Sequence, residues 1–272
     1  MGHQLQLVGH PKSLGHVKDC SARNRIMPIH LTWLGHSTFR IETEGKTFLI
    51  DPWITQNPLC PESEKHQKKV DVLLCTHGHG DHIGDAVAIC REHQPLVVGI
   101  FELATWLGSK GAKNISPMNK GGTQEVAGVK VTMTHAVHSC GIQEEDGSFI
   151  YGGEACGYVL EFASGLKLYH AGDTAVFSDM QIIHDLYRPE VALLPMGDHF
   201  TMGIREAEYA CRLLKPRVVI PMHFGTFPML IGDPRKLAPA ATRQHFDLWE
   251  MKPGVPRELV LEERSMPTTV DI

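Results

Sequence analysis

The stretch Thr76–His82 places three histidines and one aspartate within six residues, and it constrains the fold more than any other part of the chain. It directly follows the largely apolar run Val70–Cys75, which has the composition of a buried strand. Side chains alternate along an extended backbone, so His77 and His79 leave the strand end on the same side. The two glycines of the stretch allow the sharp turn that brings such side chains close together.

Asp81 and His82 fall at the start of Ile83–His93, where apolar residues recur at helical spacing. Strand, turn and helix therefore deliver two pairs of potential ligands to one place. Neutral imidazoles suit zinc, iron and nickel, and a carboxylate extends the range to manganese. A solvated turn rich in histidine is the alternative, but four potential ligands at the end of a strand favour a metal site.

The composition is that of a globular protein, with 42% hydrophobic and 21% charged residues in a chain of 272. This length allows one large domain or two tightly joined halves. The net charge of −5 and the lack of a long basic run argue against nucleic acid as the main partner. The seven scattered cysteines form no Cys-x-x-Cys pair, which indicates reduced thiols in a cytoplasmic protein. No stretch reaches the roughly 18 apolar residues that a membrane span needs.

Residues 1–26 differ from the rest of the chain. They are mildly basic, carry three dispersed histidines and show no sustained hydrophobic period. The apolar segment of a secretory signal is missing, and a weak organellar transit peptide remains the alternative to a simple extension. We therefore expect a flexible N-terminal extension over residues 1–26 and a single domain over residues 27–272.

Strand and helix patterns alternate along that domain. Strands are predicted at His30–Leu34, Phe39–Thr43, Thr47–Asp51, Val72–Thr76, Pro95–Ile100, Val129–Thr134, Tyr158–Phe162, Leu166–His170, Val191–Pro195 and Arg217–Pro221. Helices are predicted at Ile83–His93, Phe101–Gly108, Met180–Tyr187, Ile204–Leu214 and Pro234–Gln244. Several of these strands, drawn from both halves of the chain, end in a polar cluster that contains histidine or aspartate. Such strand ends can line a single cleft.

Three further residues at strand ends are candidate ligands, namely His138, Asp173 and His223. Each one alone would more often be a hydrogen-bonded structural residue. His135 lies three residues before His138 and competes for the same ligand position. Cys140 is interpreted as a buried structural thiol, because free cysteine is commonly buried.

In their order and spacing these residues resemble the metallo-β-lactamase superfamily, whose pattern is H-x-H-x-D-H followed by His, Asp and His. Within it, seven separated motifs resemble the UPF0173 group of metal-dependent hydrolases, which is related to ascorbate-6-phosphate lactonase. These motifs are Gly35–Phe39, Ile50–Pro52, Thr76–His82, Phe101–Thr105, His170–Thr174, Phe200–Gly203 and Pro221–His223.

The resemblance implies an α/β fold, a four-layer αβ/βα sandwich with the metal site at one edge of its two sheets. It also implies two divalent metal ions, zinc or manganese. The ligands implied for the first are His77, His79 and His138, those for the second are Asp81, His82 and His223, and Asp173 would bridge the two. A single metal ion would leave this set of seven ligands over-supplied.

The function that we expect is a binuclear hydrolase that directs a metal-bound hydroxide at a small ester, lactone or phosphoester. Asp81, His36 and His199 are its candidate catalytic residues, although the family pattern often has Asn in place of His199. Its expected partner is a small-molecule substrate, with no membrane, and a homo-oligomer is compatible with the sequence.

Three other functions compete with this hypothesis. A nuclease or phosphodiesterase acting on RNA or nucleotides would need a basic arm or an inserted domain, and this chain has neither. Diiron flavoprotein relatives replace the second histidine of the motif by Glu, whereas this chain keeps His79. A scaffold protein that has lost its activity would have lost ligands, and here all seven are present.

Overall fold

The computed structural model describes residues 28–260, so the predicted extension over residues 1–26 lies outside the described residues. Two seven-stranded mixed sheets and one small hairpin carry the strands of this part of the chain. All six cysteines within it are buried free thiols. No helix in residues 28–260 has the length and apolar character needed to cross a membrane.

The first sheet comes from the N-terminal half of the chain plus one strand near its end. In spatial order it consists of β16 (Pro256–Glu258), β1 (His30–Trp33), β2 (Phe39–Thr43), β3 (Lys46–Ile50), β4 (Val72–Leu74), β5 (Leu96–Ile100) and β6 (Asn114–Met118). The pairs from β16 to β3 are antiparallel, whereas those from β3 to β6 are parallel.

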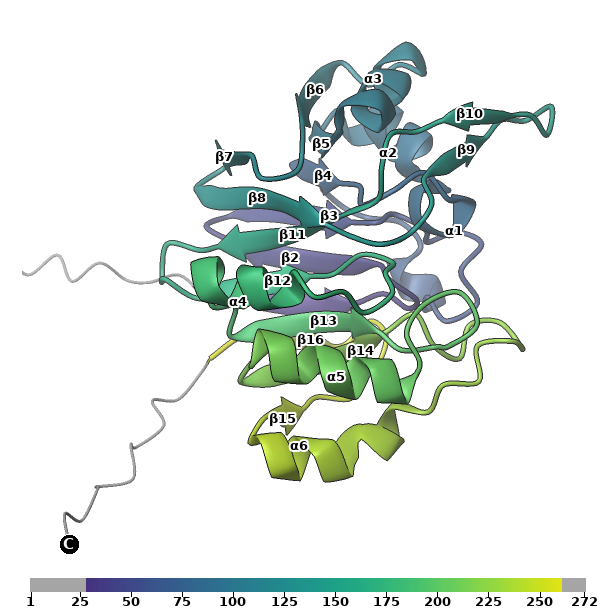
Figure 1. Cartoon of the computed structure of the whole chain (residues 1–272). Helices are drawn as coiled ribbons and strands as arrows, with labels where there is room; N and C mark the ends of the chain where they lie inside the picture. The colour runs from purple at the N-terminus through teal and green to yellow at the C-terminus, as the bar shows by residue number, and fades with distance from the viewer. Residues whose placement is uncertain (1–27, 261–272) are drawn as a thin grey trace, which may run out of the picture.

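The second sheet repeats this plan. In spatial order it consists of β15 (Asp247–Leu248), β14 (Val218–Met222), β13 (Val191–Pro195), β12 (Lys167–His170), β11 (Cys156–Glu161), β8 (Val129–His135) and β7 (Thr123–Val126). Its pairs from β7 to β12 are antiparallel and those from β12 to β15 are parallel. The hairpin of β9 (Gly141–Gln143) and β10 (Phe149–Tyr151) forms between β8 and β11 and projects from the body (Figure 1).

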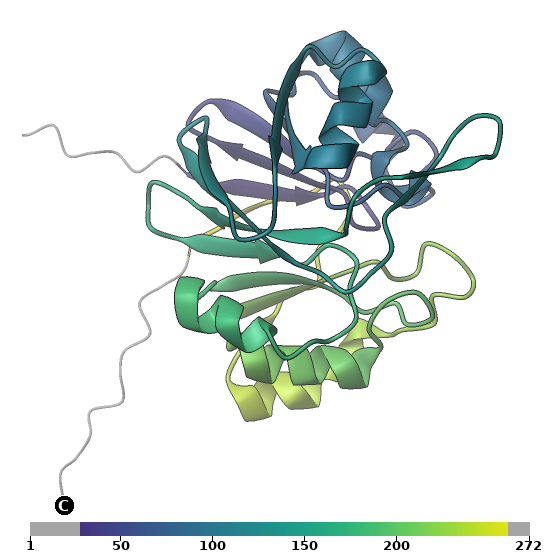
Figure 2. The same cartoon turned by 45° about the horizontal axis from the view of Figure 1, so that its top comes forward.

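Helices cover the outer faces of the two sheets. Beside the first sheet lie α1 (Gly80–Ile83), α2 (Ala86–His93) and α3 (Phe101–Ser109), and on the second lie α4 (Met180–Tyr187), α5 (Ile204–Leu214) and α6 (Ala238–Gln244). The layers follow one another as helices, sheet, sheet and helices (Figure 2). This architecture confirms the predicted four-layer sandwich. Two short 3₁₀ turns, Glu62–Glu64 and Pro234–Leu237, complete the described elements.

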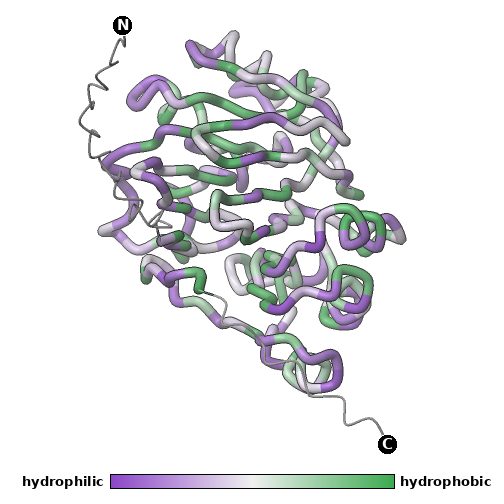
Figure 3. Tube along the Cα trace, turned by 90° about the vertical axis from the view of Figure 1, so that its left-hand side faces the viewer, coloured by the Kyte–Doolittle hydropathy of each residue, from purple (hydrophilic) through white to green (hydrophobic). Residues whose placement is uncertain are grey.

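Hydrophobic strands form the interior of the sandwich. Every residue of β4, β13 and β14 is buried, as parallel strands covered on both faces require. Along the chain trace, hydrophobic stretches alternate with hydrophilic ones (Figure 3). The core is thus formed by the strands, and the polar segments that follow them can supply functional side chains at the strand ends.

Strand direction explains why the functional residues meet. The parallel strands β3, β4, β12, β13 and β14 end at the same edge of the sandwich, where sites of α/β proteins usually form. β1 reaches β3 through two antiparallel pairings, and β8 reaches β12 in the same way. β1 therefore runs in the direction of β3, and β8 in the direction of β12. The residues that follow them therefore reach the same edge.

Most predicted elements are confirmed, and the differences have physical causes. The single helix expected over Ile83–His93 is two helices, because the backbone leaves the helical region at Asp85, whose side chain accepts hydrogen bonds from the Ile54 and Thr55 N–H groups. Sequence patterns did not predict β6, β7, β9, β10, β15 and β16, which are short edge or hairpin strands. In β6 a proline also interrupts the strand pattern, as it can at the edge of a sheet.

Candidate metal centre

Two clusters of imidazole and carboxylate groups meet at this edge. Nitrogen atoms of His77, His79 and His138 lie within 4.8 Å of one another and form the first cluster. The second cluster consists of His36, Asp81, His82 and His223, with the same spacing. The structure thus brings together all the histidines of the predicted ligand set, and it adds His36 to the second cluster.

The first cluster joins the turn after β4 to the turn after β8. His77 Nε2 and His79 Nδ1 are 3.0 Å apart, and the rings of both lie within 5.0 Å of the His138 ring. The remaining nitrogen of His79 lies 3.2 Å from Ser139 Oγ, which can accept its N–H. Histidines that bind metal commonly donate their second N–H in this way. His135 instead faces solvent beside Lys120, at 3.0 Å from its Nζ.

Asp173 stands between the two clusters. Its Oδ2 lies 3.9 Å from His77 Nε2 and 3.7 Å from His138 Nε2 in the first cluster. The same oxygen lies 3.3 Å from His82 Nε2 and 2.9 Å from His223 Nε2 in the second. One carboxylate oxygen within reach of both clusters has the position of a bridging ligand.

A short turn fixes Asp173 there. The buried His170 at the end of β12 accepts a hydrogen bond at Nδ1 from the Gly172 N–H, 3.1 Å away. Its other ring nitrogen lies 3.1 Å from the Ser37 carbonyl oxygen, in the turn between β1 and β2, and can donate to it. Gly172 has a φ of +63°, and a Cβ there would lie 2.4 Å from the Cys156 carbonyl oxygen. This turn therefore needs glycine.

The second cluster is held by a chain of hydrogen bonds through His36. His36 Nε2 lies 3.1 Å from Asp81 Oδ2, and its Nδ1 lies 2.9 Å from Thr226 Oγ1. This pattern fits an imidazole that donates to Asp81 and accepts from the threonine hydroxyl. The His36 carbonyl oxygen in turn accepts the backbone N–H of His223. His36, in the turn after β1, thus orients two potential ligands, Asp81 and His223, from different parts of the chain.

Asp51, directly after β3, supports both clusters from behind. Its fully buried carboxylate accepts hydrogen bonds from the Thr76 N–H (2.8 Å), the Thr76 hydroxyl (2.7 Å) and His82 Nδ1 (2.8 Å). Thr76 Oγ1 also lies 3.0 Å from His77 Nδ1. Sequence reasoning missed Asp51 and Thr76 as site residues, although both lie at the ends of buried strands and within the motifs Ile50–Pro52 and Thr76–His82.

Burial and mutual charge set the protonation of the site. Burial lowers the pKa of His77, His79 and His138, so these imidazoles are neutral and have lone pairs for a cation. Burial acts against the charged forms of Asp173 and His82 as well. For Asp173 the attraction to His223 and His82 outweighs burial, so its pKa falls. For His82 the attraction to Asp173 and Asp51 outweighs burial, so its pKa rises.

Asp81 and His36 follow the same logic. Burial opposes the ionisation of Asp81, but the hydrogen bond from His36 and the nearby imidazoles outweigh it and keep its pKa low. Burial lowers the pKa of His36 to about 4, so this ring is neutral near pH 7. An ionised Asp81 beside a neutral His36 is suited to holding a cation or a water molecule.

The site fits divalent metal ions. Asp173 Oδ1 and His82 Nε2 are buried and make no hydrogen bond among the described residues. Such orphaned polar atoms are costly unless a further group satisfies them. Imidazole nitrogens and carboxylate oxygens together form a donor set that zinc and manganese accept.

A cleft of about 460 Å³ gives access to the clusters. Its walls include five of the predicted ligands together with Ser139 and two phenylalanines, and those ligands are His79, Asp81, His138, Asp173 and His223. The two predicted residues outside the cleft walls, His77 and His82, lie in the fully buried layer behind.

Two other residues considered from the sequence lie differently. His199 is exposed, and its contacts among the described residues are with its neighbours Asp198 and Phe200, so its catalytic role stays a prediction. Cys140 is buried and its thiol lies 3.1 Å from the Gly152 carbonyl oxygen. Burial raises the pKa of this thiol to about 11, in keeping with the structural role expected for it.

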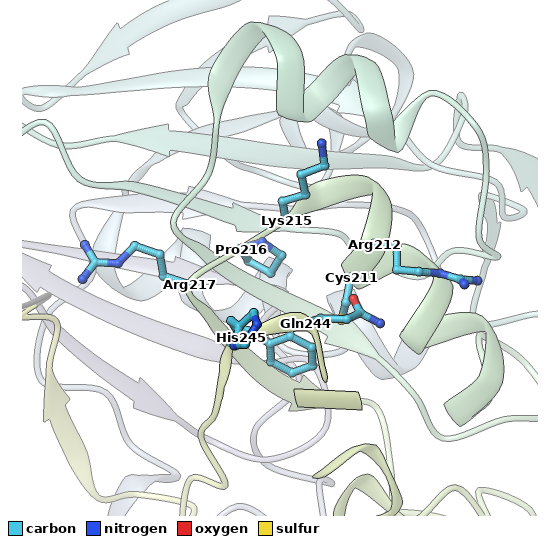
Figure 4. Close-up of a pocket in the computed structure, with 8 residues that line it drawn as sticks. Cys211, Arg212, Lys215, Pro216, Arg217, Gln244 and His245 are labelled. Carbon is cyan, nitrogen blue, oxygen red and sulfur yellow. The ribbon is translucent and has the colours of Figure 1, made fainter. Parts of the chain in front are cut away.

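A separate hollow of about 300 Å³ lies at the C-terminal ends of α5 and α6, next to Cys211 and Phe246. Its basic side chains, Arg212, Lys215 and Arg217, point in different directions (Figure 4). Basic residues are favoured at helix C-termini because they offset the negative end of the helix dipole. This hollow is therefore explained by helix capping and has no convergent groups for catalysis.

Known proteins resemble this chain along most of its length. Residues 30–223 match the beta-lactamase superfamily domain. A UPF0173 metal-dependent hydrolase of Koribacter versatilis is 59% identical over 227 residues, which cover 83% of this chain and 96% of that protein. One from Solibacter usitatus is 52% identical over 229 residues, covering 84% and 99%. The solved structure of Igni18, a novel metallo hydrolase from the archaeon Ignicoccus hospitalis, superposes with a TM-score of 0.77 at 36% identity, covering 86% of this chain and 100% of that one.

Proposed function

The chain belongs to the UPF0173 metal-dependent hydrolases of the β-lactamase superfamily, and on this premise we propose a binuclear enzyme that hydrolyses a small ester, lactone or phosphoester. The observation that carries the proposal is the position of Asp173 Oδ2, within 4 Å of imidazole nitrogens from both clusters. In this proposal His77, His79 and His138 hold one ion, Asp81, His82 and His223 hold the other, and Asp173 is shared.

The chain's own residues then have defined tasks. When bound, two divalent ions lower the pKa of a water molecule and stabilise negative charge that develops on the substrate. Asp81 Oδ2 is occupied by His36, whereas no hydrogen bond among the described residues reaches Oδ1. Asp81 Oδ1 can therefore accept a hydrogen bond from the attacking water and orient it. The cleft above it would hold the substrate against this water.

Metal content is the first test of the binuclear proposal. After reconstitution with zinc or manganese and removal of excess metal, we expect two ions per chain by elemental analysis. Seven nitrogen and oxygen ligands exceed the four that a tetrahedral zinc site uses. Chelation should abolish the turnover of small esters, and added metal should restore it.

Two results would contradict this proposal in different ways. A reproducible value of one ion per chain would remove the binuclear site but leave a metal hydrolase. Strongly salt-dependent cleavage of RNA, without turnover of small molecules, would favour the nuclease instead.

His36 is proposed to position Asp81 at the second metal. His36→Ala should weaken the second of two zinc-binding steps by roughly 10–100-fold, the usual cost of losing an outer partner of a ligand. Calorimetric titration separates the two steps. Thr226→Val removes only the hydroxyl at His36 Nδ1 and should weaken the same step less. Equal weakening of both steps would assign His36 to general packing.

A further inference from the structure

Two exposed aromatic rings line the cleft beside the metal centre. Phe149 of β10 is 69% exposed, and Phe200, in the loop after β13, is 52% exposed. The hairpin and that loop belong to different parts of this edge of the sandwich (Figure 1). Large apolar side chains exposed together next to a site commonly mark a binding surface.

The hairpin that carries Phe149 is fixed to the body. Glu144 Oε1 accepts a hydrogen bond from Trp106 Nε1 (2.8 Å), and its Oε2 accepts one from Lys110 Nζ (2.6 Å), both on or next to α3. At the base of the hairpin, the Gly152 N–H donates to the Cys140 carbonyl oxygen at 3.0 Å. A hairpin that is closed at its base and bonded through Glu144 to Trp106 and Lys110 can present the ring of Phe149 in one place.

Within the hairpin, the ring of Phe149 lies over Gly141. A Cβ added to Gly141 would lie 3.4 Å from Phe149 Cδ1, and both residues line the cleft. Tyr151 is on the same strand and is 72% exposed, but it is not part of the cleft wall. The hairpin therefore directs one of its two aromatic residues toward the metal centre.

A second cleft of about 440 Å³ adjoins the first, since both are lined by Gly80 and Asp81. It contains the stacked rings of Trp53 and Phe227, whose centroids are 5.6 Å apart. Its acidic residue besides Asp81 is Asp85, which is already engaged by the backbone N–H groups of Ile54 and Thr55. This side of the metal centre is also aromatic.

Neither cleft has a cationic wall. Of the described residues that line the two clefts, none is lysine or arginine. A phosphate or carboxylate on the substrate, away from the bond that is cleaved, would lose its water without gaining a positively charged partner. An apolar or aromatic group would instead gain from burial between the rings.

We propose, on the basis of the hydrolase function proposed above, that the substrate is a carboxylic ester or lactone whose flanking groups are uncharged and aromatic or apolar, with one of them held against Phe149 and Phe200. In the reaction the acyl carbon–oxygen bond breaks, water supplies a hydroxyl to the acid, and its remaining proton goes to the alcohol. Substrates with an additional phosphate or carboxylate are poor ones.

The test compares matched 4-nitrophenyl esters on the metal-reconstituted protein. We expect kcat/KM to be higher for the 3-phenylpropanoate than for the acetate, and higher for the neutral butyrate than for the hemisuccinate. Phe149→Ala and Phe200→Ala should each lower the phenylpropanoate-to-acetate ratio about tenfold, the range for removing an apolar contact in a pocket. Tyr151→Ala is the control and should leave this ratio unchanged.

A charge insertion tests the other half of the proposal. Gln143→Lys places an amine in the cleft wall and should raise the hemisuccinate-to-butyrate ratio several-fold, because it supplies the missing partner. The inference would be overturned if the wild type preferred the hemisuccinate, or if neither phenylalanine variant changed the phenylpropanoate-to-acetate ratio. Either result would leave the proposed hydrolase function in place. Turnover of phosphoesters alone would overturn the inference only, whereas no turnover of either carboxylic esters or phosphoesters by the wild-type protein would overturn the proposed function itself, and the inference with it.

Discussion

Asp173→Ala should reduce the metal content from two ions per chain to one or none and lower kcat/KM for esters by more than roughly 100-fold, the upper end for losing an outer partner of a ligand. The reason is that one oxygen of Asp173 faces four imidazole nitrogens drawn from both clusters. Without it, neither ion has its shared negative ligand. Elemental analysis and ester kinetics give the two readouts.

The fold should survive this change, because β12 and the hydrogen bonds of His170 do not depend on the carboxylate. Far-UV circular dichroism of Asp173→Ala should therefore match that of the wild type. Asp179→Ala, which removes an exposed carboxylate next to α4, is the matched control and should keep both ions. A fully active Asp173→Ala protein with two bound ions would rule out the bridging role.

Asp51→Asn should retain the fold and lose most of its zinc affinity, although Asp51 is not one of the proposed ligands. The carboxylate accepts from His82 Nδ1, so a proton is held on Nδ1 and Nε2 is the nitrogen of this ring that faces Asp173 and would bind a metal ion. An asparagine that keeps the hydrogen bond from the Thr76 N–H turns its NH₂ toward His82. That group cannot accept, so the ring must place its proton on Nε2, where the metal would bind.

We expect a loss of affinity of roughly 10–100-fold, typical of outer partners of metal ligands. Calorimetric zinc titration measures it, and nitrogen NMR of the histidine side chains reports the change of tautomer. Asp71→Asn is the control, because this carboxylate accepts a backbone N–H from Thr47 far from either cluster. Unchanged affinity with an unchanged tautomer would show that Asp51 only supports the strand end.

The proximity of the candidate ligands could be predicted because these residues follow strong local patterns. His77 and His79 follow a strand that is apolar throughout, and so does His223, whereas Asp173 follows β12, whose last three residues are buried. Parallel strands with both faces buried have continuous hydrophobic runs, which are readable without knowledge of their neighbours. The family and the sandwich fold were predicted on the same residues and are confirmed.

Sequence analysis named His36 as a candidate, but neither its partner Thr226 nor the role of Asp51 could be predicted in this way, because both depend on residues that are distant in the chain. Asp51 and His82 are 31 residues apart, and His36 and Thr226 are 190 apart. Edge strands such as β16 were missed for a related reason. Their side chains are exposed, so pairing with a neighbour, rather than a hydrophobic pattern, makes them strands.

The division of the ligands between the two sheets has a consequence for assembly. The first sheet supplies the ligands after β4, whereas His138, Asp173 and His223 follow strands of the second. Neither half of the chain holds all seven of the proposed ligands. The complete proposed site can form only after the halves have docked, and a metal ion bound there would link the two sheets. Metal release should therefore favour separation of the two sheets. Amide hydrogens at the interface between the sheets should exchange faster in the metal-free protein than in the metal-loaded one.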